Sequence, residues 1–404
     1  MISVLQARDI ILENCRRQKA VTVSLSASVD RVLAEDIKAD VAMPPFNRSM
    51  MDGYALRSED TKVPHHKLKV IGNVAAGSYP RFKIGSGEAA KIMTGAPVPP
   101  GADAVQKIEL TTSSEDGRMM HSVQPVQAGL HIVKRGEEKA RGEIVLAAGS
   151  HITPTAVGVL AATGTTTVKI VRPPTVAILA TGNELVAPDV KPLQGQIRDS
   201  NSFTLQALCR RLKLKTILLG IAKDDKALLK EKIRRGLACD MMLVTGGVSM
   251  GDHDFVDDVF KEMGFSIFFK KVAIKPGKPT VFARYTEKPI FGLPGNPVSS
   301  ATVFDVLVRP ALRKMMGSAV YSDLSVSGIL SNAVSNKSMR ELFHPAVTWY
   351  QDGVFRCHPL RTRGSGDISG YAKGNSYLNV PAETGTVPQG STVSILLRDN
   401  FNLS

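Results

Sequence analysis

The sharpest chemical signal in the sequence is a glycine-rich turn, Thr245-Gly246-Gly247-Val248-Ser249, which directly follows an apolar run at residues 241–244. Adjacent glycines let several backbone N–H groups point into one concavity, and the hydroxyl of Ser249 adds another donor. If a helix begins just after it, such a turn suits a phosphate group. Glycine-rich turns also serve as plain connections between a strand and a helix, so both interpretations stay open for the turn alone.

Two carboxylates, Asp252 and Asp254, come directly after this turn. They would repel a bound phosphate unless a divalent cation such as Mg²⁺ bridged carboxylate and phosphate oxygens. The alternative is that Asp254 caps the helix expected at 255–263. One aspartate can cap the helix while the other binds the cation.

Basic and turn-forming residues make two further candidate anion sites. In Lys275-Pro276-Gly277-Lys278-Pro279 the prolines stiffen the chain, so that two ammonium groups can converge on one oxyanion. A solvated basic turn is the alternative. The segment 292–297 precedes a long helix expected at about Ser299–Met316, whose N-terminus also favours an anion.

The elements around these residues predict how they are positioned. Strands at 176–180, 216–221 and 241–244 alternate with helices at 203–212, 226–237 and 255–263. This alternation predicts a parallel sheet covered on both faces, with ligands bound at the carboxyl ends of its strands. Glu184 follows the first of these strands, and Asp224 and Asp225 follow the second, so their side chains are expected at that edge.

The remaining segments predict a multidomain protein of the α/β plus β class. Apolar spacing predicts a helix at 2–17, short strands run between turns from about 68 to 146, and a helix is expected at 153–162. Pro173-Pro174 marks a boundary, and strand-like sequence follows Ser318. The expected domains are an N-terminal region at 1–172 (mixed at 1–45 and 145–172, with a β module inserted at 46–144), an α/β domain at 173–317 and a small β domain at 318–404.

Composition narrows the class of protein without deciding the ligand. A net charge of +14 favours anionic partners, yet aromatic residues make up only 5% and no nucleic-acid-binding motif occurs, so a small anion fits at least as well as nucleic acid. No apolar run is long enough to span a membrane, and the first residues do not form a secretory signal. The four cysteines form no C-x-x-C pair. We therefore expect a cytoplasmic protein with buried free thiols.

Several segments, taken together and in order, resemble the MoeA-type molybdopterin molybdenumtransferases, a family that includes the E domain of gephyrin. The resemblance spans roughly residues 1 to 397. The glycine turn alone would fit a wider group that includes MogA-type adenylyltransferases, whereas the N-terminal and C-terminal segments are specific to MoeA. The matching stretches are PPFNRSMMDGYAL, KIMTGAPVPPGADAV, ATGNEL, GQIRDSN, VTGGVSMGDHDF, IKPGKP, FGLPGNPVS and GSGDIS.

The resemblance implies an activity and a set of partners. The enzyme would take adenylylated molybdopterin and molybdate, insert molybdenum at the dithiolene sulfurs and release AMP, with Mg²⁺ or a similar divalent cation. The α/β domain would be a MogA-like molybdopterin-binding domain. The resemblance also implies an elongated homodimer. Further expected partners are a MogA-type adenylyltransferase and molybdoenzyme maturation proteins. The alternative is a catalytically weak pterin-binding or scaffold paralogue on the same fold.

The resemblance also assigns roles to individual residues. The positions that match catalytic residues are Asp52, Thr94, Glu138, Glu184, Asp224 and Asp254, of which Asp224 and Asp254 would bind the metal. The positions that match ligand-binding residues are Gly246, Gly247, Ser249, Pro294 and Pro297 for the pterin and its phosphates, and Lys275, Lys278, Ser299, Arg340 and Ser365 for molybdate. The sequence departs from the family at Glu138, where aspartate is usual, and at His344-Pro345, where an arginine is common.

Overall fold

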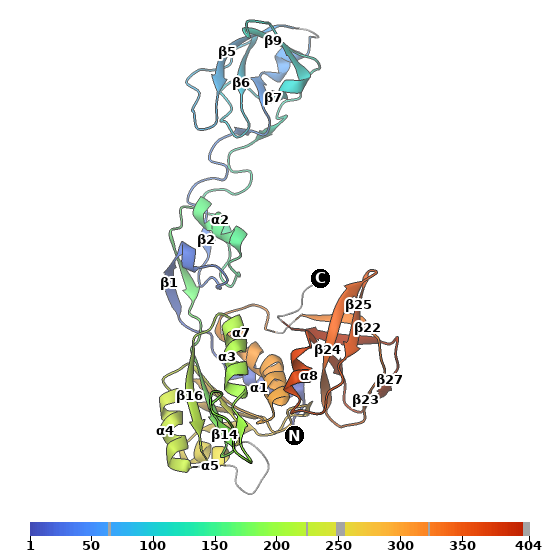
Figure 1. Ribbon diagram of the computed structural model, residues 1–404. Coiled ribbons are helices and arrows are strands. Elements are labelled where there is room, and N and C mark those ends of the chain that lie inside the picture. Colours follow the sequence, from blue (N-terminus) through green and yellow to red (C-terminus); the bar gives the residue numbers. More distant parts are fainter. Residues whose placement is uncertain (64–65, 224, 248–254, 322–323, 399–404) are drawn as a thin grey trace.

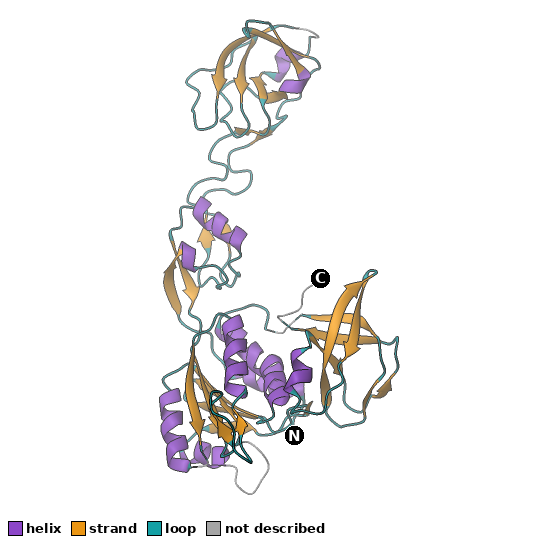
Figure 2. Cartoon of the chain, viewed as in Figure 1, coloured by secondary structure: helices purple, strands orange, loops and turns teal. Residues whose placement is uncertain are grey.

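The computed structural model describes residues 1–63, 66–223, 225–247, 255–321 and 324–398. It shows an elongated molecule with four bodies (Figure 1). A β module lies at one end, a small linker module follows, and an α/β domain stands beside a C-terminal β domain at the other end. Figure 2 shows helices concentrated in the α/β domain and strands dominating the other bodies. The predicted fold class is confirmed.

The α/β domain is built on a six-stranded mixed sheet. Its strand order is β16 (Thr216–Ala222), β13 (Val176–Thr181), β17 (Met241–Thr245), β21 (Lys288–Leu293), β20 (Val281–Tyr285) and β18 (Ser266–Phe269). The first four strands are parallel, as predicted, but β20 and β18 pair antiparallel. The reason is local: only Thr286 and Glu287 connect β20 to β21, and so short a connection permits only an antiparallel hairpin.

Helices cover both faces of this sheet, as the sequence predicted. On one face α4 (Lys226–Gly236) and α5 (Phe255–Glu262) share a core with alternate sheet residues such as Leu179 and Val244. On the other face α3 (Asn201–Arg211) packs against Ile178 and Leu243. The expected long helix there has three parts and begins earlier than predicted: α6 (Pro297–Val303), a π-helical turn η4 (Phe304–Val308) and α7 (Arg309–Met315).

The N-terminal helix α1 (Val4–Glu13) belongs to this second face and not to the N-terminal region, where the sequence analysis had placed residues 1–45. Its apolar residues Val4, Ala7 and Ile11 are buried in the same core as α7. A helix with one apolar stripe must bury that stripe against a partner, and the α/β domain supplies the partner. Ser3 and Gln6 form a capping box that fixes where the helix starts.

The C-terminal domain is a closed ring of five strands. β24 (Glu341–Gln351) pairs with both β25 (Val354–Pro359) and β26 (Ser376–Val380), and β22 (Ser325–Leu330) with β28 (Thr392–Leu397) completes the ring. β19 (Ile274–Lys275), a strand of the α/β domain, pairs with β24. The smaller elements are β23 (Val334–Asn336), β27 (Gly385–Val387) and α8 (Ile368–Ala372).

A buried ionic cluster fastens the C-terminal domain to the α/β domain. Asp305 of η4 forms an ion pair with Arg309, and each side chain is only 1% exposed. From the C-terminal domain, Tyr377 donates a 2.8 Å hydrogen bond to Asp305, and Arg398 approaches the same carboxylate at 3.6 Å. Tyr377 also belongs to the hydrophobic core of the α/β domain. The two domains therefore share one continuous interior.

The β module and the linker module, together called the arm below, have cores of their own. The linker module pairs β1 (Ala20–Ser24) with β12 (Thr167–Val171) and β2 (Ile37–Lys38) with β11 (Ile144–Leu146), beside α2 (Pro154–Ala162). The β module has the strand order β7 (Ala104–Lys107), β4 (Gly53–Leu56), β6 (Glu88–Ile92), β5 (Leu68–Val74), β9 (Met119–Ser122) and β8 (Thr111–Ser113). The short pair β3 (Arg48–Ser49) and β10 (Ile132–Val133) lies beside it.

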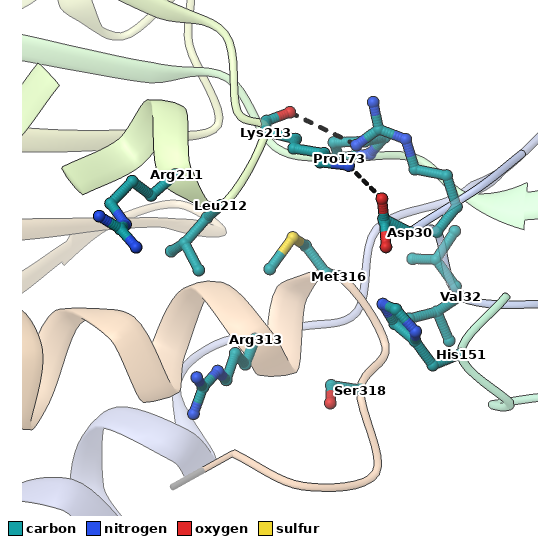
Figure 3. Close-up of a pocket in the computed structure, with 12 residues that line it drawn as sticks. Asp30, Val32, His151, Pro173, Arg211, Leu212, Lys213, Arg313, Met316 and Ser318 are labelled. Atoms are coloured by element: carbon teal, nitrogen blue, oxygen red, sulfur yellow. Dashed lines mark hydrogen bonds and ion pairs between the residues drawn. The ribbon is translucent and has the colours of Figure 1, made fainter. Parts of the chain in front are cut away.

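The base of the arm contacts the α/β domain mainly through polar groups. Arg172 makes two hydrogen bonds to Asp240, at 2.9 and 2.7 Å, and Lys213 forms an ion pair with Asp30. Arg31 also donates to the carbonyl of Lys213. The contacts of Lys213 with Asp30 and Arg31 border a cavity of about 280 Å³ (Figure 3). The arm thus meets the α/β domain at an interface that still contains space.

The cysteines are free and buried, as predicted. Burial raises the pKa of Cys15 and of Cys209 to about 12, which leaves both thiols protonated at neutral pH. Among the residues that the structure describes, no helix is long and apolar enough to cross a membrane.

Candidate active site

A cavity of about 470 Å³ opens at the carboxyl ends of three neighbouring parallel strands, β13, β17 and β21. This is the edge at which the sequence analysis expected a ligand. The predicted residues that line the cavity are Glu184, Gly246, Gly247, Pro294 and Pro297. Strand order brings them together, because residues 181–184, 245–247 and 294–297 follow adjacent strands.

The backbone of the glycine turn accepts no other residue without strain. Gly246 and Gly247 have φ values of +86° and +65°, in the left-handed region. A Cβ on Gly246 would lie 2.2 Å from the carbonyl oxygen of Thr181, and one on Gly247 would lie 2.6 Å from the Thr181 hydroxyl. The two glycines therefore allow the end of β17 to pack closely against the end of β13. Ser249, Asp252, Asp254 and Asp224, which the sequence analysis also placed here, lie outside the described residues.

The sequence analysis gave no role to Asn201, which joins two walls of the cavity. Its Nδ2 donates to the hydroxyl of Thr245 at 2.8 Å and to the carbonyl of Gly295 at 2.7 Å. The side chain of nearby Asp199 accepts a hydrogen bond from the backbone N–H of Ser202 at 3.0 Å. The segment GQIRDSN carried the signal, but a polar run ahead of a helix is also what an ordinary helix cap looks like.

The segments that carry the residues expected to bind an oxyanion meet at α6. Gly277, between Lys275 and Lys278, packs so closely on this helix that a Cβ there would lie 2.5 Å from the side chain of Val303. Ser299 is buried in the first turns of the helix. The C-terminal domain reaches the same place, because Ser365 accepts a 2.8 Å hydrogen bond from Asn296 and its carbonyl accepts one from the N–H of Val298 at 3.1 Å.

A second cavity, of about 750 Å³, lies beside this group. Its basic lining residues are Lys275, Arg361 and two histidines, His344 and His358, and no carboxylate lines it among the described residues. Arg340, the remaining predicted oxyanion-binding residue, lines neither this cavity nor the one at the strand ends. Its described contacts use only its backbone carbonyl, which accepts from Asn336 and Ser338.

The predicted catalytic residues of the arm line neither cavity, and the β module next to them stands at the opposite end of the molecule from the α/β domain (Figure 1). Asp52 accepts hydrogen bonds from the backbone N–H of Thr94 at 2.6 Å and from its hydroxyl at 2.9 Å. These two bonds lower the pKa of Asp52, so its carboxylate stays ionised at neutral pH. Glu138 forms an ion pair with Arg48 at 3.1 Å. The structure thus pairs Asp52 with Thr94 but does not bring them to the glycine turn of their own chain.

Comparisons with known protein families match nearly the whole chain. Three family models match in sequence: the MoeA N-terminal region (domain I and II) over residues 2–164, a probable molybdopterin-binding domain over 177–314, and the MoeA C-terminal region (domain IV) over 327–397. The chain belongs to the molybdopterin molybdenumtransferase (MoeA) family. A relative of that name from Bacillus subtilis (strain 168) is 34% identical over 387 residues, which cover 93% of this chain and 89% of the relative. Another, from Staphylococcus aureus (strain MSSA476), is 33% identical and covers 99% of this chain and 96% of its own length.

Solved structures agree with this assignment. Two crystal structures of the molybdopterin biosynthesis protein MoeA from Pyrococcus horikoshii superpose on this chain with TM-scores of 0.83 and 0.85, each at 32% identity. They cover 99% and 98% of this chain, and all of their own. The match includes the arm and the C-terminal domain as well as the α/β domain.

Proposed function

We propose that this protein is a molybdopterin molybdenumtransferase, which inserts molybdenum into adenylylated molybdopterin and releases AMP. The cavity at the ends of β13, β17 and β21 carries the proposal, because it is lined by Gly246 and Gly247, whose positive-φ backbone can present N–H groups to an anion. Membership of the family supports the same activity. Two anionic substrates also suit a chain with a net charge of +14.

In this proposal the glycine turn receives phosphate groups of the adenylylated pterin. Backbone N–H groups at a left-handed turn form an anion-binding concavity, and the side chain of Asn201 holds the facing loop at Gly295 in place. Glu184 is exposed at the rim of the cavity, where its carboxylate can accept hydrogen bonds from the substrate.

We propose that Asp224 and Asp254 bind Mg²⁺ or a similar divalent cation. Both residues lie outside the described residues. A bound divalent cation would neutralise the phosphates and polarise the bond that breaks when AMP leaves. Among the described residues no cluster of three or more His, Cys, Asp or Glu side chains could hold a metal, so the two aspartates are the test of this assignment.

We place the molybdate site between Lys275, Lys278, Ser299 and Ser365, whose segments meet at α6. Lysine ammonium groups and hydroxyls are donors, and an oxyanion offers only acceptors. The absence of a carboxylate from the described lining of the adjoining cavity favours the approach of an anion from that side.

We further propose that the active enzyme is a homodimer in which the arm of one chain completes the site of the other. Asp52 and Thr94 match catalytic positions of the family, yet they lie at the far end of their own chain. Their neighbours Met50 and Met93 are 48% and 46% exposed, and beside the cavity Leu193 and Ile197 are 74% and 57% exposed. Docking between two copies would bury these apolar side chains.

An assay with purified protein tests the activity directly. The reaction contains adenylylated molybdopterin, Mg²⁺ and molybdate, and both AMP and molybdenum cofactor are measured. A molybdenumtransferase releases AMP as the cofactor forms. Binding of the pterin without AMP release would instead identify a carrier or scaffold protein. For the dimer, light scattering coupled to gel filtration should give twice the chain mass of 43.4 kDa. A monomer at the concentration of the assay would contradict the shared site.

A further inference from the structure

His344 is the residue that stands where the family commonly has an arginine, and it lies between two parts of the oxyanion site. It is on β24, two residues after Leu342, which pairs with Lys275 of β19. Residues two apart on a strand face the same side, and Leu342, His344 and Lys275 all line the 750 Å³ cavity. β24 is thus the scaffold on which Lys275 is placed.

The same strand also holds the segment that carries Ser365. The His344 Nε2 lies 2.8 Å from the carbonyl oxygen of Leu360, and the N–H of Leu360 donates to the carbonyl of Pro345 at 2.9 Å. A carbonyl oxygen only accepts hydrogen bonds, so His344 carries its proton on Nε2. The carbonyl and the N–H of Leu360 are therefore both hydrogen bonded to residues of β24.

Four residues separate this anchor from Ser365, and the far end of the segment is also held. The carboxylate of Asp367 accepts hydrogen bonds from the backbone N–H groups of Arg363 at 3.0 Å and Gly370 at 2.9 Å. These bonds lower the pKa of Asp367 to about 2, so it stays ionised. Ser365 lies between the two anchors and contacts Asn296 and Val298 of the α/β domain.

His344 contributes geometry rather than charge. Burial lowers the pKa of His344 below its usual value, and the positive charge of Lys275 lowers it further, although the bond to Leu360 opposes both. The imidazole is therefore neutral at pH 7. An arginine at this position would add a cation to the cavity, which neutral His344 does not.

We propose that His344 is a positioning residue for the oxyanion substrate: by holding Leu360 against β24 it sets the separation between Lys275 and Ser365. This inference rests on the proposed function, because it assumes that these two residues bind molybdate. It extends that function by naming a residue that acts through others without touching the substrate.

Direct binding of molybdate, measured by calorimetry on the full-length protein, tests the proposal. His344→Phe keeps a ring of similar shape but has no N–H donor, and we expect molybdate affinity to fall about five- to tenfold. His344→Gln can still donate to the Leu360 carbonyl and should stay within about twofold of the unaltered protein. Affinity for AMP should be the same in all three proteins.

Two comparisons separate positioning from general damage to the domain. Trp349 lies on the same strand β24, lines neither cavity and donates its indole N–H to the side chain of Gln351 at 3.1 Å, so Trp349→Phe should leave molybdate binding unchanged. If His344 acts through Ser365, His344→Phe combined with Ser365→Ala should bind molybdate no more weakly than Ser365→Ala alone.

The possible failures are distinguishable. Unchanged molybdate affinity in His344→Phe, or additive losses in the double variant, would overturn the positioning role while leaving the proposed function in place. Should His344→Phe fail to fold, His344→Leu, which also lacks the N–H donor, takes its place, and unchanged molybdate affinity in that variant or a clear loss in His344→Gln would contradict the proposal. An unaltered protein that binds no molybdate would overturn the proposed function and this inference with it.

Discussion

The C-terminal domain and the arm both carry residues that match the family's functional positions, but they are joined to the α/β domain in opposite ways. The C-terminal domain shares a hydrophobic core with it and adds the buried cluster of Asp305, Arg309, Tyr377 and Arg398. The arm has separate cores and meets the α/β domain through polar contacts beside a cavity.

This difference indicates how each region can serve the site. Ser365 reaches α6 of its own chain and is held there by hydrogen bonds, so the C-terminal domain acts within one chain. The β module that carries Asp52 and Thr94 stands at the far end of the arm (Figure 1), so in the proposed dimer these two residues would act on a second chain. Rigid attachment of the C-terminal domain suits a role within one chain. A role in a second chain requires an arm long enough to extend to it.

Breaking the buried cluster should have the largest effect. Asp305→Ala leaves Arg309 charged in the interior without its partner, which typically lowers the free energy of unfolding by about 3–5 kcal/mol. Denaturant titration measures this loss. The matched control is Glu287→Ala, which removes an exposed pair with Arg16 at 2.8 Å and should cost less than about 1 kcal/mol. Equal losses in the two variants would mean that the junction is not the stabilising contact we describe.

Distorting the glycine turn should lower activity strongly, with a smaller loss of stability than in Asp305→Ala. In Gly246→Ala the new Cβ would meet the Thr181 carbonyl, and we expect AMP release to fall at least about tenfold, which corresponds to about 1.4 kcal/mol in the barrier. Gly87→Ala is the control, because Gly87 also has positive φ (+72°) but an open surrounding. If the two variants lose activity equally, the strain of the backbone and not the shape of the cavity is responsible.

Asn201→Asp should have a smaller effect that is concentrated on substrate binding. The substitution removes both N–H donors and places a carboxylate beside the carbonyl of Gly295 and near an anionic substrate. We expect a KM for adenylylated molybdopterin raised about tenfold, with the loss of stability limited to about 1–3 kcal/mol. Steady-state kinetics and thermal unfolding measure the two effects, and an unchanged KM would remove Asn201 from the site.

A change in the arm should leave stability almost untouched. Thr94→Val keeps the backbone bond to Asp52 but removes the hydroxyl bond at an exposed position, so the melting temperature should not change. AMP release should nevertheless fall, because Asp52 is then less firmly oriented. Full activity in Thr94→Val would show that the arm contributes no oriented group to catalysis.

The sequence predicted local elements better than it predicted the contacts between domains. Gly246, Gly247 and the ends of the parallel strands follow from local patterns, and they lie at the predicted edge of the sheet. The alternation of strands and helices likewise predicted the fold class. The packing partner of α1 could not be predicted from its sequence. The apolar face of the helix shows that it packs against something, but not which domain supplies that surface. Asn201 and the Asp305 cluster were missed because contacts between residues far apart in the chain leave no periodic signal.

Complementation between two damaged chains tests the shared site most directly. Asp52→Ala alters only the arm, and Glu184→Ala alters only the cavity of the α/β domain. Each variant alone should be inactive. Co-expressed with different tags and purified through both, they form heterodimers with one intact and one doubly altered site, and AMP release should return to about half of the unaltered level. Heterodimers as inactive as the two parent variants would place both residues in a site built from a single chain and would contradict the account.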